Sequence, residues 1–229
     1  RLPHVVQWRP WHLAGDMVPA LPVIGVVRAD EATVTTVDNV PLLLWDWKTE
    51  PFMLVVGRNN IGKTVCVLQL VRGAMDLITV ETIVWIDGKG EGDAMCLDGR
   101  PKVLKVAVQP EEWMETLRWV HAYAENKHAE ILAWRSGLRP RPNVPDVVVV
   151  IDEVQRVQEH DPEATRMLSD LARTARSAGI HLIILTQRPD VADTLPGAVR
   201  EQLHVRIVVR DSGPGVPGEL RDRLFEPER

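Results

Sequence analysis

The chain has 229 residues, of which 45% are hydrophobic and 26% charged, and its formal net charge at pH 7 is −5. This composition is that of a globular protein with a sizeable core, and it excludes a disordered tail and a fibre. The negative charge disfavours a globally basic surface that coats nucleic acid, although a few basic side chains lining a pore could still hold a charged polymer.

No segment predicts a membrane span or a secretory signal, and no membrane contact is expected within the chain. The longest apolar runs, such as Val147–Ile151 and Ile180–Leu185, have the length of a strand and are too short to cross a bilayer. Residues 1–10 hold charge and two prolines instead of the apolar stretch of a signal peptide. Cys66 and Cys96 lack the spacing of a metal site, which favours reduced thiols in a cytoplasmic protein.

The chain divides into three parts by composition. Residues 1–50 hold several prolines and alternating segments such as Ala32–Val37, which predicts a β-rich lead-in. Residues 51–210 alternate short β-branched runs with longer amphipathic stretches, which is typical of an α/β fold with a mainly parallel sheet and helices on both faces. Residues 211–229 are rich in glycine, proline and charge and break this rhythm. Because the chain starts at Arg1 without a methionine, we expect a piece of a longer protein.

A phosphate-binding loop follows the first core strand, expected at Met53–Val56, and precedes a helix expected at Thr64–Asp76. The glycines of such a loop let successive backbone N–H groups turn toward a phosphate, Lys63 places a positive charge against the β- and γ-phosphates, and the Thr64 hydroxyl is a ligand for Mg²⁺. We therefore predict a site for ATP and Mg²⁺; the alternative is a glycine turn that holds no ligand. The match to the pattern G-x-x-x-x-G-K-[ST] is complete and comprises Gly57, Arg58, Asn59, Asn60, Ile61, Gly62, Lys63 and Thr64.

Two strands and a long helix are expected next, at Thr82–Ile86, Val103–Ala107 and Glu111–Ser136. Apolar side chains recur along this helix at spacings of 4, 3 and 4, which predicts one buried face. Its tryptophans are expected to pack in the core or at an interface, the alternative being a platform for stacked bases. The helix should end near Gly137, before a loop at Arg139–Pro145. The residues of the predicted buried face are Trp113, Leu117, Val120 and Ala124.

Two carboxylates end the fourth core strand, expected at Val147–Ile151. That run is apolar without alternation, as in a central parallel strand covered on both faces. Asp152 would hold Mg²⁺ at the carboxyl end of the strand, and Glu153 would orient and deprotonate an attacking water. A dedicated acid at this position favours hydrolysis over phosphoryl transfer to a small molecule. The alternative is that Glu153 only caps a helix or faces solvent.

A helix expected at Asp161–Ala178 and a strand expected at Ile180–Thr186 carry a resemblance to a known family. The helix ends in R-x-x-G-I-H-L and the strand in T-Q-R-P, and both resemble the motor domain of the FtsK/SpoIIIE translocases. The segment Ile86–Gly90 is similar to the Asp-Pro-Lys segment of that family, and the last strand, expected at His204–Val209, resembles the one that follows T-Q-R-P. The resemblance covers roughly residues 20–210.

The resemblance implies a RecA-like P-loop NTPase that hydrolyses ATP to translocate double-stranded DNA, in chromosome partitioning or conjugative plasmid transfer. Gln187 would sense the γ-phosphate or the attacking water. Such motors are rings, usually hexamers, in which a basic finger enters the neighbouring site; Arg206 and Arg176 are the candidates here, and a surface ion pair is the alternative for each. The longer parent protein would be anchored at the inner face of the cell membrane.

Two departures from the family pattern stand out. Asn60 occupies a position where the family commonly has glycine, but asparagine tolerates a positive φ better than other residues do. The segment Asp211–Pro227 resembles an ATP-binding segment of sensor histidine kinases, in which the residue matching Asp211 binds adenine. Because no partner segment of that site is present in the sequence, we expect residues 211–229 to contribute nothing to nucleotide binding.

Two other functions remain open. A type VII secretion ATPase has the same fold and moves peptides, and an exposed apolar groove would favour it over a DNA motor, whereas a basic pore loop would favour DNA. A truncated module that binds nucleotide without turnover is the other alternative.

Overall fold

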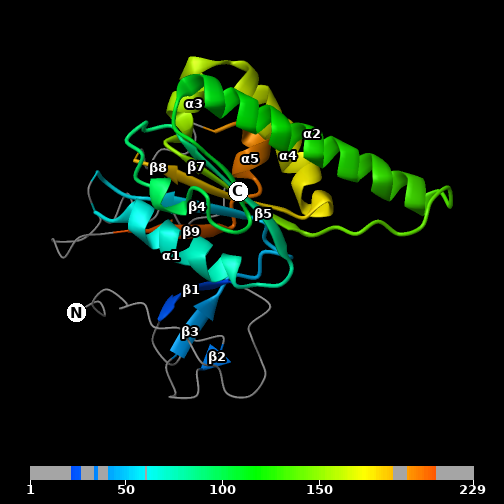
Figure 1. The fold of residues 1–229 in the computed structure, drawn as a ribbon, viewed down its shortest axis with the longest axis horizontal. Helices are drawn as coiled ribbons and strands as arrows, with labels where there is room; N and C mark the ends of the chain where they lie inside the picture. The colour runs from blue at the N-terminus through cyan, green and yellow to red at the C-terminus, as the bar shows by residue number, and fades with distance from the viewer. Residues whose placement is uncertain (1–21, 27–33, 36–40, 60, 188–194, 210–229) are drawn as a thin grey trace.

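The computed structural model describes residues 22–26, 34–35, 41–59, 61–187 and 195–209. Six parallel strands form its main sheet, in the order β6-β5-β7-β8-β4-β9 (Figure 1). Two of them, β6 and β8, have the bounds predicted from the sequence, and the other four differ by one or two residues at one or both ends. The strands are β4 (Phe52–Val56), β5 (Val80–Asp87), β6 (Val103–Ala107), β7 (Asp146–Asp152), β8 (Ile180–Thr186) and β9 (Val205–Val208).

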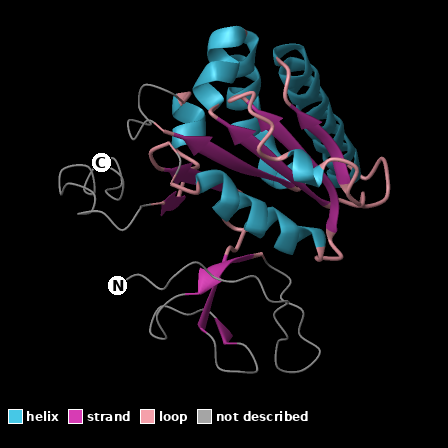
Figure 2. Ribbon diagram, turned by 60° about the vertical axis from the view of Figure 1, so that its left-hand side comes forward, coloured by secondary structure: helices cyan, strands magenta, loops and turns pink. Residues whose placement is uncertain are grey.

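Helices cover both faces of this sheet, which confirms the predicted α/β fold class (Figure 2). On one face lie α2 (Pro110–Arg135), α3 (Val154–His160), α4 (Glu163–Ala178) and α5 (Gly197–Arg200). On the other lie α1 (Lys63–Met75) and the short 3₁₀ helix η1 (Met95–Leu97). The strands β4, β7 and β8 are buried along their whole length, which explains their unbroken apolar sequences.

The long helix α2 buries the face that its sequence predicts. Trp113, Leu117, Val120 and Ala124 are at most 4% exposed. The expectation of core packing holds for Trp113 alone among the helix's tryptophans, because Trp119 and Trp134 are 38% and 36% exposed.

Three short helices were not expected from the sequence: η1, α3 and α5. The helix predicted at Asp161–Ala178 begins two residues later than expected, at Glu163. The Asp161 carboxylate accepts a hydrogen bond from the Glu163 N–H at 2.9 Å, and the extended backbone of Asp161 separates α3 from α4. The polar segment that follows Glu153 hid α3 because only Val154 and Val157 mark its buried side.

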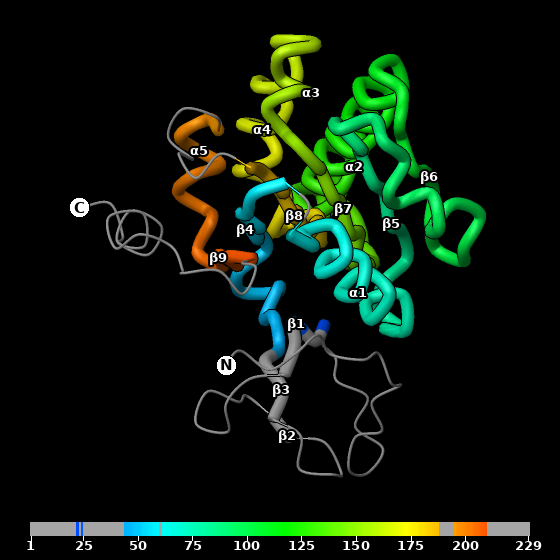
Figure 3. Tube along the Cα trace, turned by 90° about the vertical axis from the view of Figure 1, so that its left-hand side faces the viewer, coloured from blue at the N-terminus to red at the C-terminus, as the bar shows by residue number. Residues whose placement is uncertain are grey.

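Part of the lead-in forms a separate antiparallel sheet in the order β1-β3-β2. Its strands are β1 (Val23–Val26), β2 (Val34–Thr35) and β3 (Pro41–Leu44), and it lies on the α1 side of the molecule (Figure 1). Figure 3 shows β1 beside α1 from another side. Trp45 and Trp47, on the connection from β3 to β4, are 1% and 0% exposed. Among the helices of the described ranges, none combines the length and apolarity needed to span a bilayer.

Candidate nucleotide-binding site

The loop between β4 and α1 requires glycine at two positions. A Cβ on Gly57 would lie 2.4 Å from Cδ1 of Ile61 and 2.8 Å from the carbonyl oxygen of Val209, so a larger residue does not fit. Gly62 has φ 91°, a left-handed conformation that glycine adopts without strain, and it directly precedes the first turn of α1. The N–H groups at this helix terminus are available to an anion.

Lys63 is buried inside the loop at 7% exposure. Its Nζ donates hydrogen bonds to the carbonyl oxygens of Gly57 and Arg58, at 2.7 and 2.9 Å. The ammonium therefore lies where the backbone curves around the predicted phosphate position. Asn60, the departure from the family pattern, lies outside the described residues.

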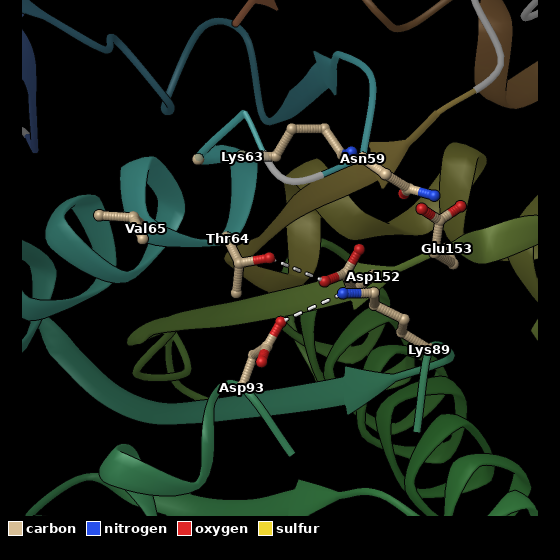
Figure 4. A pocket seen from close by; sticks show the side chains of 9 residues that line it. Asn59, Lys63, Thr64, Val65, Lys89, Asp93, Asp152 and Glu153 are labelled. Atoms are coloured by element: carbon tan, nitrogen blue, oxygen red, sulfur yellow. Dashed lines mark hydrogen bonds and ion pairs between the residues drawn. The ribbon is translucent and has the colours of Figure 1, made fainter. Parts of the chain in front are cut away.

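A cavity of about 310 Å³ opens beside this loop at the carboxyl ends of the strands (Figure 4). Three segments line it: the loop with the start of α1, the segment after β5, and the end of β7. This is the edge at which parallel α/β sheets bind ligands, and the volume suits a small molecule. The lining residues are Asn59, Gly62, Lys63, Thr64, Val65, Lys89, Asp93, Asp152 and Glu153.

The two predicted Mg²⁺ ligands meet at the floor of the cavity. The Thr64 hydroxyl donates a hydrogen bond to Oδ2 of Asp152 at 3.3 Å, across 88 residues of sequence (Figure 4). Asp152 is 3% exposed, and burial raises its pKa to about 6, with the Glu153 and Asp87 carboxylates adding to the shift. Hard oxygen donors in a site with surplus negative charge fit a Mg²⁺ ion, whose charge would relieve the repulsion between these carboxylates.

Glu153 follows Asp152 with an unusual backbone. Its φ of 50° and ψ of 56° lie in the left-handed region, which is uncommon for a residue other than glycine. Its side chain makes no capping hydrogen bond to α3 and is 2% exposed. The carboxylate therefore neither caps the helix nor faces solvent, but lines the cavity and accepts a hydrogen bond from Nε2 of Gln155.

The segment after β5 contributes two cavity residues to which the sequence assigned no role, Lys89 and Asp93. Asp87, aligned with Asp152 in the sheet, accepts hydrogen bonds from the backbone N–H groups of Lys89, Gly90 and Gly92 and so shapes this segment. The sequence could have predicted these cavity residues, because their segment also follows the carboxyl end of a parallel strand.

The predicted sensor lies at the same edge of the sheet, since Gln187 directly follows β8 and β8 lies between β4 and β7. The two finger candidates lie elsewhere. Arg206, on the edge strand β9, donates from Nε to the Leu203 carbonyl at 3.0 Å, and Arg176, in the last turn of α4, donates to the Thr49 carbonyl. Neither lines the cavity. Residues 188–189 of the T-Q-R-P motif and the tail 211–229 lie outside the described residues.

Comparison with known proteins adds an independent line of evidence. No family model matches the chain. Curated proteins named DNA translocase FtsK do: the one from Bacillus cereus is 30% identical over 181 residues, and the match covers 69% of this chain and 22% of that protein. The one from Caldanaerobacter subterraneus is 26% identical over 178 residues, covering 72% and 25%. The chain is a relative of the FtsK DNA translocases. It spans about a quarter of the length of these relatives.

Solved structures show that this FtsK relative has the fold of a RecA-like P-loop ATPase. EssC (ATPases 2 and 3) of Geobacillus thermodenitrificans aligns with a TM-score of 0.68 at 16% identity, covering 94% of this chain and 41% of that one. The conjugation coupling protein TcpA of pCW3, solved with ATPγS, aligns with a TM-score of 0.60 at 17% identity, covering 90% and 62%. The type VII secretion ATPase EccC of Thermomonospora curvata aligns with a TM-score of 0.63 at 19% identity, covering 88% and 24%.

Proposed function

We propose that the chain is an ATP-hydrolysing motor domain that moves double-stranded DNA in the cytoplasm, in chromosome partitioning or conjugative plasmid transfer. The observation that carries the proposal is the meeting of the phosphate-binding loop, Asp152 and Glu153 in one cavity. The names of its FtsK relatives and of the coupling protein TcpA support DNA as the cargo. We also propose residues 51–210 as the motor core, residues 1–50 as a lead-in and residues 211–229 as a tail outside the site.

Each cavity residue has a role in this proposal. The backbone N–H groups of the loop after Gly57, up to Thr64, and the Lys63 ammonium bind the phosphates, and Thr64 and Asp152 hold the metal. When bound, Mg²⁺ would offset the negative charge that develops on the phosphate during hydrolysis. Glu153 accepts a proton from the attacking water, and Gln187, whose amide both donates and accepts, reads the phosphate position.

The cargo is tested by stimulation of hydrolysis. We expect Mg²⁺-dependent release of phosphate from ATP, with a faster rate on double-stranded DNA and no response to an unstructured peptide. Glu153→Gln should keep ATP affinity and lower turnover by roughly 10²–10⁴-fold, the usual contribution of a positioned base.

Other outcomes would identify the alternatives. Stimulation by peptide instead of DNA would replace the proposed cargo with that of a secretion ATPase. Tight ATP binding without turnover, on DNA or off it, would indicate a nucleotide-binding module. Joint loss of binding and hydrolysis in Glu153→Gln would assign Glu153 a structural role.

A further inference from the structure

The Gln155 side chain connects the cavity to the end of the neighbouring strand β8. Gln155 is half-buried in the first turn of α3, where its Nε2 donates to Oε2 of Glu153. On the other side, the Thr186 hydroxyl donates to Oε1 of Gln155 at 3.3 Å. A carboxylate oxygen accepts hydrogen bonds and a hydroxyl can do both, so only this orientation of the amide satisfies both contacts.

The hydrogen bond from the Gln155 amide occupies one carboxylate oxygen of Glu153 and leaves the other to accept a proton. Its backbone is in the left-handed region, and its carboxylate makes no bond to the helix that it precedes. Gln155 is the side chain that restrains the carboxylate through Oε2, and Oε1 is then the oxygen that a water molecule in the cavity can reach. A base that must take a proton within a narrow range of geometry depends on such a restraint.

Thr186 connects the same network to the phosphate-binding loop. It is the last residue of β8 and fully buried, and its carbonyl oxygen accepts a hydrogen bond from the Gly57 N–H at 3.3 Å. Gln187, the predicted sensor, is the next residue. A continuous chain of contacts therefore runs from Gly57 through Thr186 and Gln155 to Glu153.

We propose that Gln155 is a positioning residue, which holds the Glu153 carboxylate in its proton-accepting orientation and couples it through Thr186 to the phosphate-binding loop. This inference rests on the proposed ATP hydrolysis. Gln155 does not line the cavity, so its loss affects the rate of the chemical step more than the binding of ATP.

The test is Gln155→Met, which keeps the length of the side chain and removes both hydrogen bonds. We expect kcat for ATP to fall roughly ten- to a hundredfold, the effect of a misplaced catalytic group, while KM changes by less than about twofold. Thr186→Val should lower kcat in the same direction, and Thr186→Ser, which keeps the hydroxyl, should restore it. In the double variant with Gln155→Met, Thr186→Val should add little, because both remove the same path.

A matched control lies one turn further along α3. The amide of Gln158 donates to the Thr165 hydroxyl at 3.1 Å, outside the cavity, so Gln158→Met should leave kcat unchanged. Wild-type kcat in Gln155→Met, beside an inactive Glu153→Gln, would overturn the inference and leave the proposed function standing. Equal losses in kcat and ATP affinity, or failure of Thr186→Ser to restore kcat, would assign these residues a structural role and overturn it too. An unmodified chain without ATP hydrolysis would overturn the proposed function, and the inference with it.

Discussion

Two lysine side chains bring positive charge to one small cavity. Burial lowers the pKa of the Lys63 ammonium and nearby Lys89 lowers it further, whereas the Glu153 and Asp152 carboxylates oppose the shift. Lys89 forms ion pairs with Glu91 and, at 3.5 Å, with Asp93. The positive charge of Lys63 is thus stabilised by the neighbouring carboxylates and by backbone carbonyls, whereas Lys89 has acidic partners on its own loop.

This difference predicts unequal effects on ATP binding. Lys63→Ala deletes the buried charge that we propose faces the phosphates, so we expect roughly a hundredfold weaker binding of a non-hydrolysable ATP analogue, about 2.8 kcal/mol. Lys89→Ala should weaken binding less, because its charge is already shared with two carboxylates. Titration calorimetry measures both, with the distant Lys127→Ala as control. Equal affinity in Lys63→Ala and wild type would contradict the assignment of the loop.

The strands β7 and β8 carry a second buried polar cluster at their amino-terminal ends, opposite the cavity. Nε2 of His181 lies 2.8 Å from Oδ1 of Asp146, with both side chains at most 2% exposed, and Lys48 pairs with the same carboxylate. The Trp47 ring stacks on the His181 ring at 4.2 Å with an interplanar angle of 9°. Since Lys48 and Trp47 belong to the segment that leads from β3 to β4, their contacts with Asp146 and His181 hold that segment against the core.

The cluster makes stability depend on pH. Burial raises the pKa of Asp146, but hydrogen bonds from His181, Lys48 and Thr79 outweigh it and bring the pKa to about 2. Burial lowers the pKa of His181 despite the attraction of Asp146. Both groups therefore bind protons more readily in the unfolded chain. Their stabilising contributions are lost as the pH decreases, first below about 6.5 for the histidine and then between about 4 and 2 for the aspartate.

We expect the contribution of His181 to the free energy of unfolding in urea to decrease as the pH falls from about 7.5 to about 5.5, while protonation of Asp152, whose pKa burial raises to about 6, contributes in the opposite direction. His181→Gln removes the titrating ring, so this variant, although less stable at pH 7.5, should lose less free energy of unfolding than the wild type over the same range. If the free energy of unfolding of the variant depended on pH as steeply as that of the wild type, groups other than His181 would control the loss of stability in acid. His204→Gln is the control, because that imidazole is 60% exposed.

The predicted ring would bring an arginine finger of one subunit to the site of its neighbour, and Arg206 is a candidate for that finger. Arg206 lies on the edge strand β9, at the opposite side of β4 from the Asp152 strand, and does not reach its own cavity. An edge position suits a residue that would act on the site of a neighbouring subunit, as an arginine finger does.

A mixing experiment tests this arrangement. Arg206→Ala should bind ATP and lose hydrolysis by several powers of ten, and Lys63→Ala should lose binding but keep its finger. If the finger acts across a subunit interface, mixing the two inactive variants should restore part of the ATPase activity. Sedimentation of the same mixtures measures the size of the ring. No recovery in mixtures that sediment as rings would exclude Arg206 as a finger acting between subunits.

Local sequence was sufficient for the phosphate-binding loop, for the apolar strands β4, β7 and β8, and for the carboxylates at the end of β7. Each of these depends on contiguous residues, because burial on both faces of a parallel sheet leaves an unbroken apolar run and the loop chemistry needs adjacent residues. The resemblance to the FtsK family rests on such contiguous segments too.

Tertiary structure alone decided what lies beside these segments. The order of strands depends on pairing between residues far apart in the chain, which no local period encodes. That order puts β8 between β4 and β7 and so brings Thr186 within hydrogen-bond distance of Gln155, which in turn contacts Glu153. The same pairing joins His181 to Asp146 across 35 residues. The helix α3, which holds Gln155, is too short to show a clear periodicity, so its contribution to the site became visible only in the folded chain.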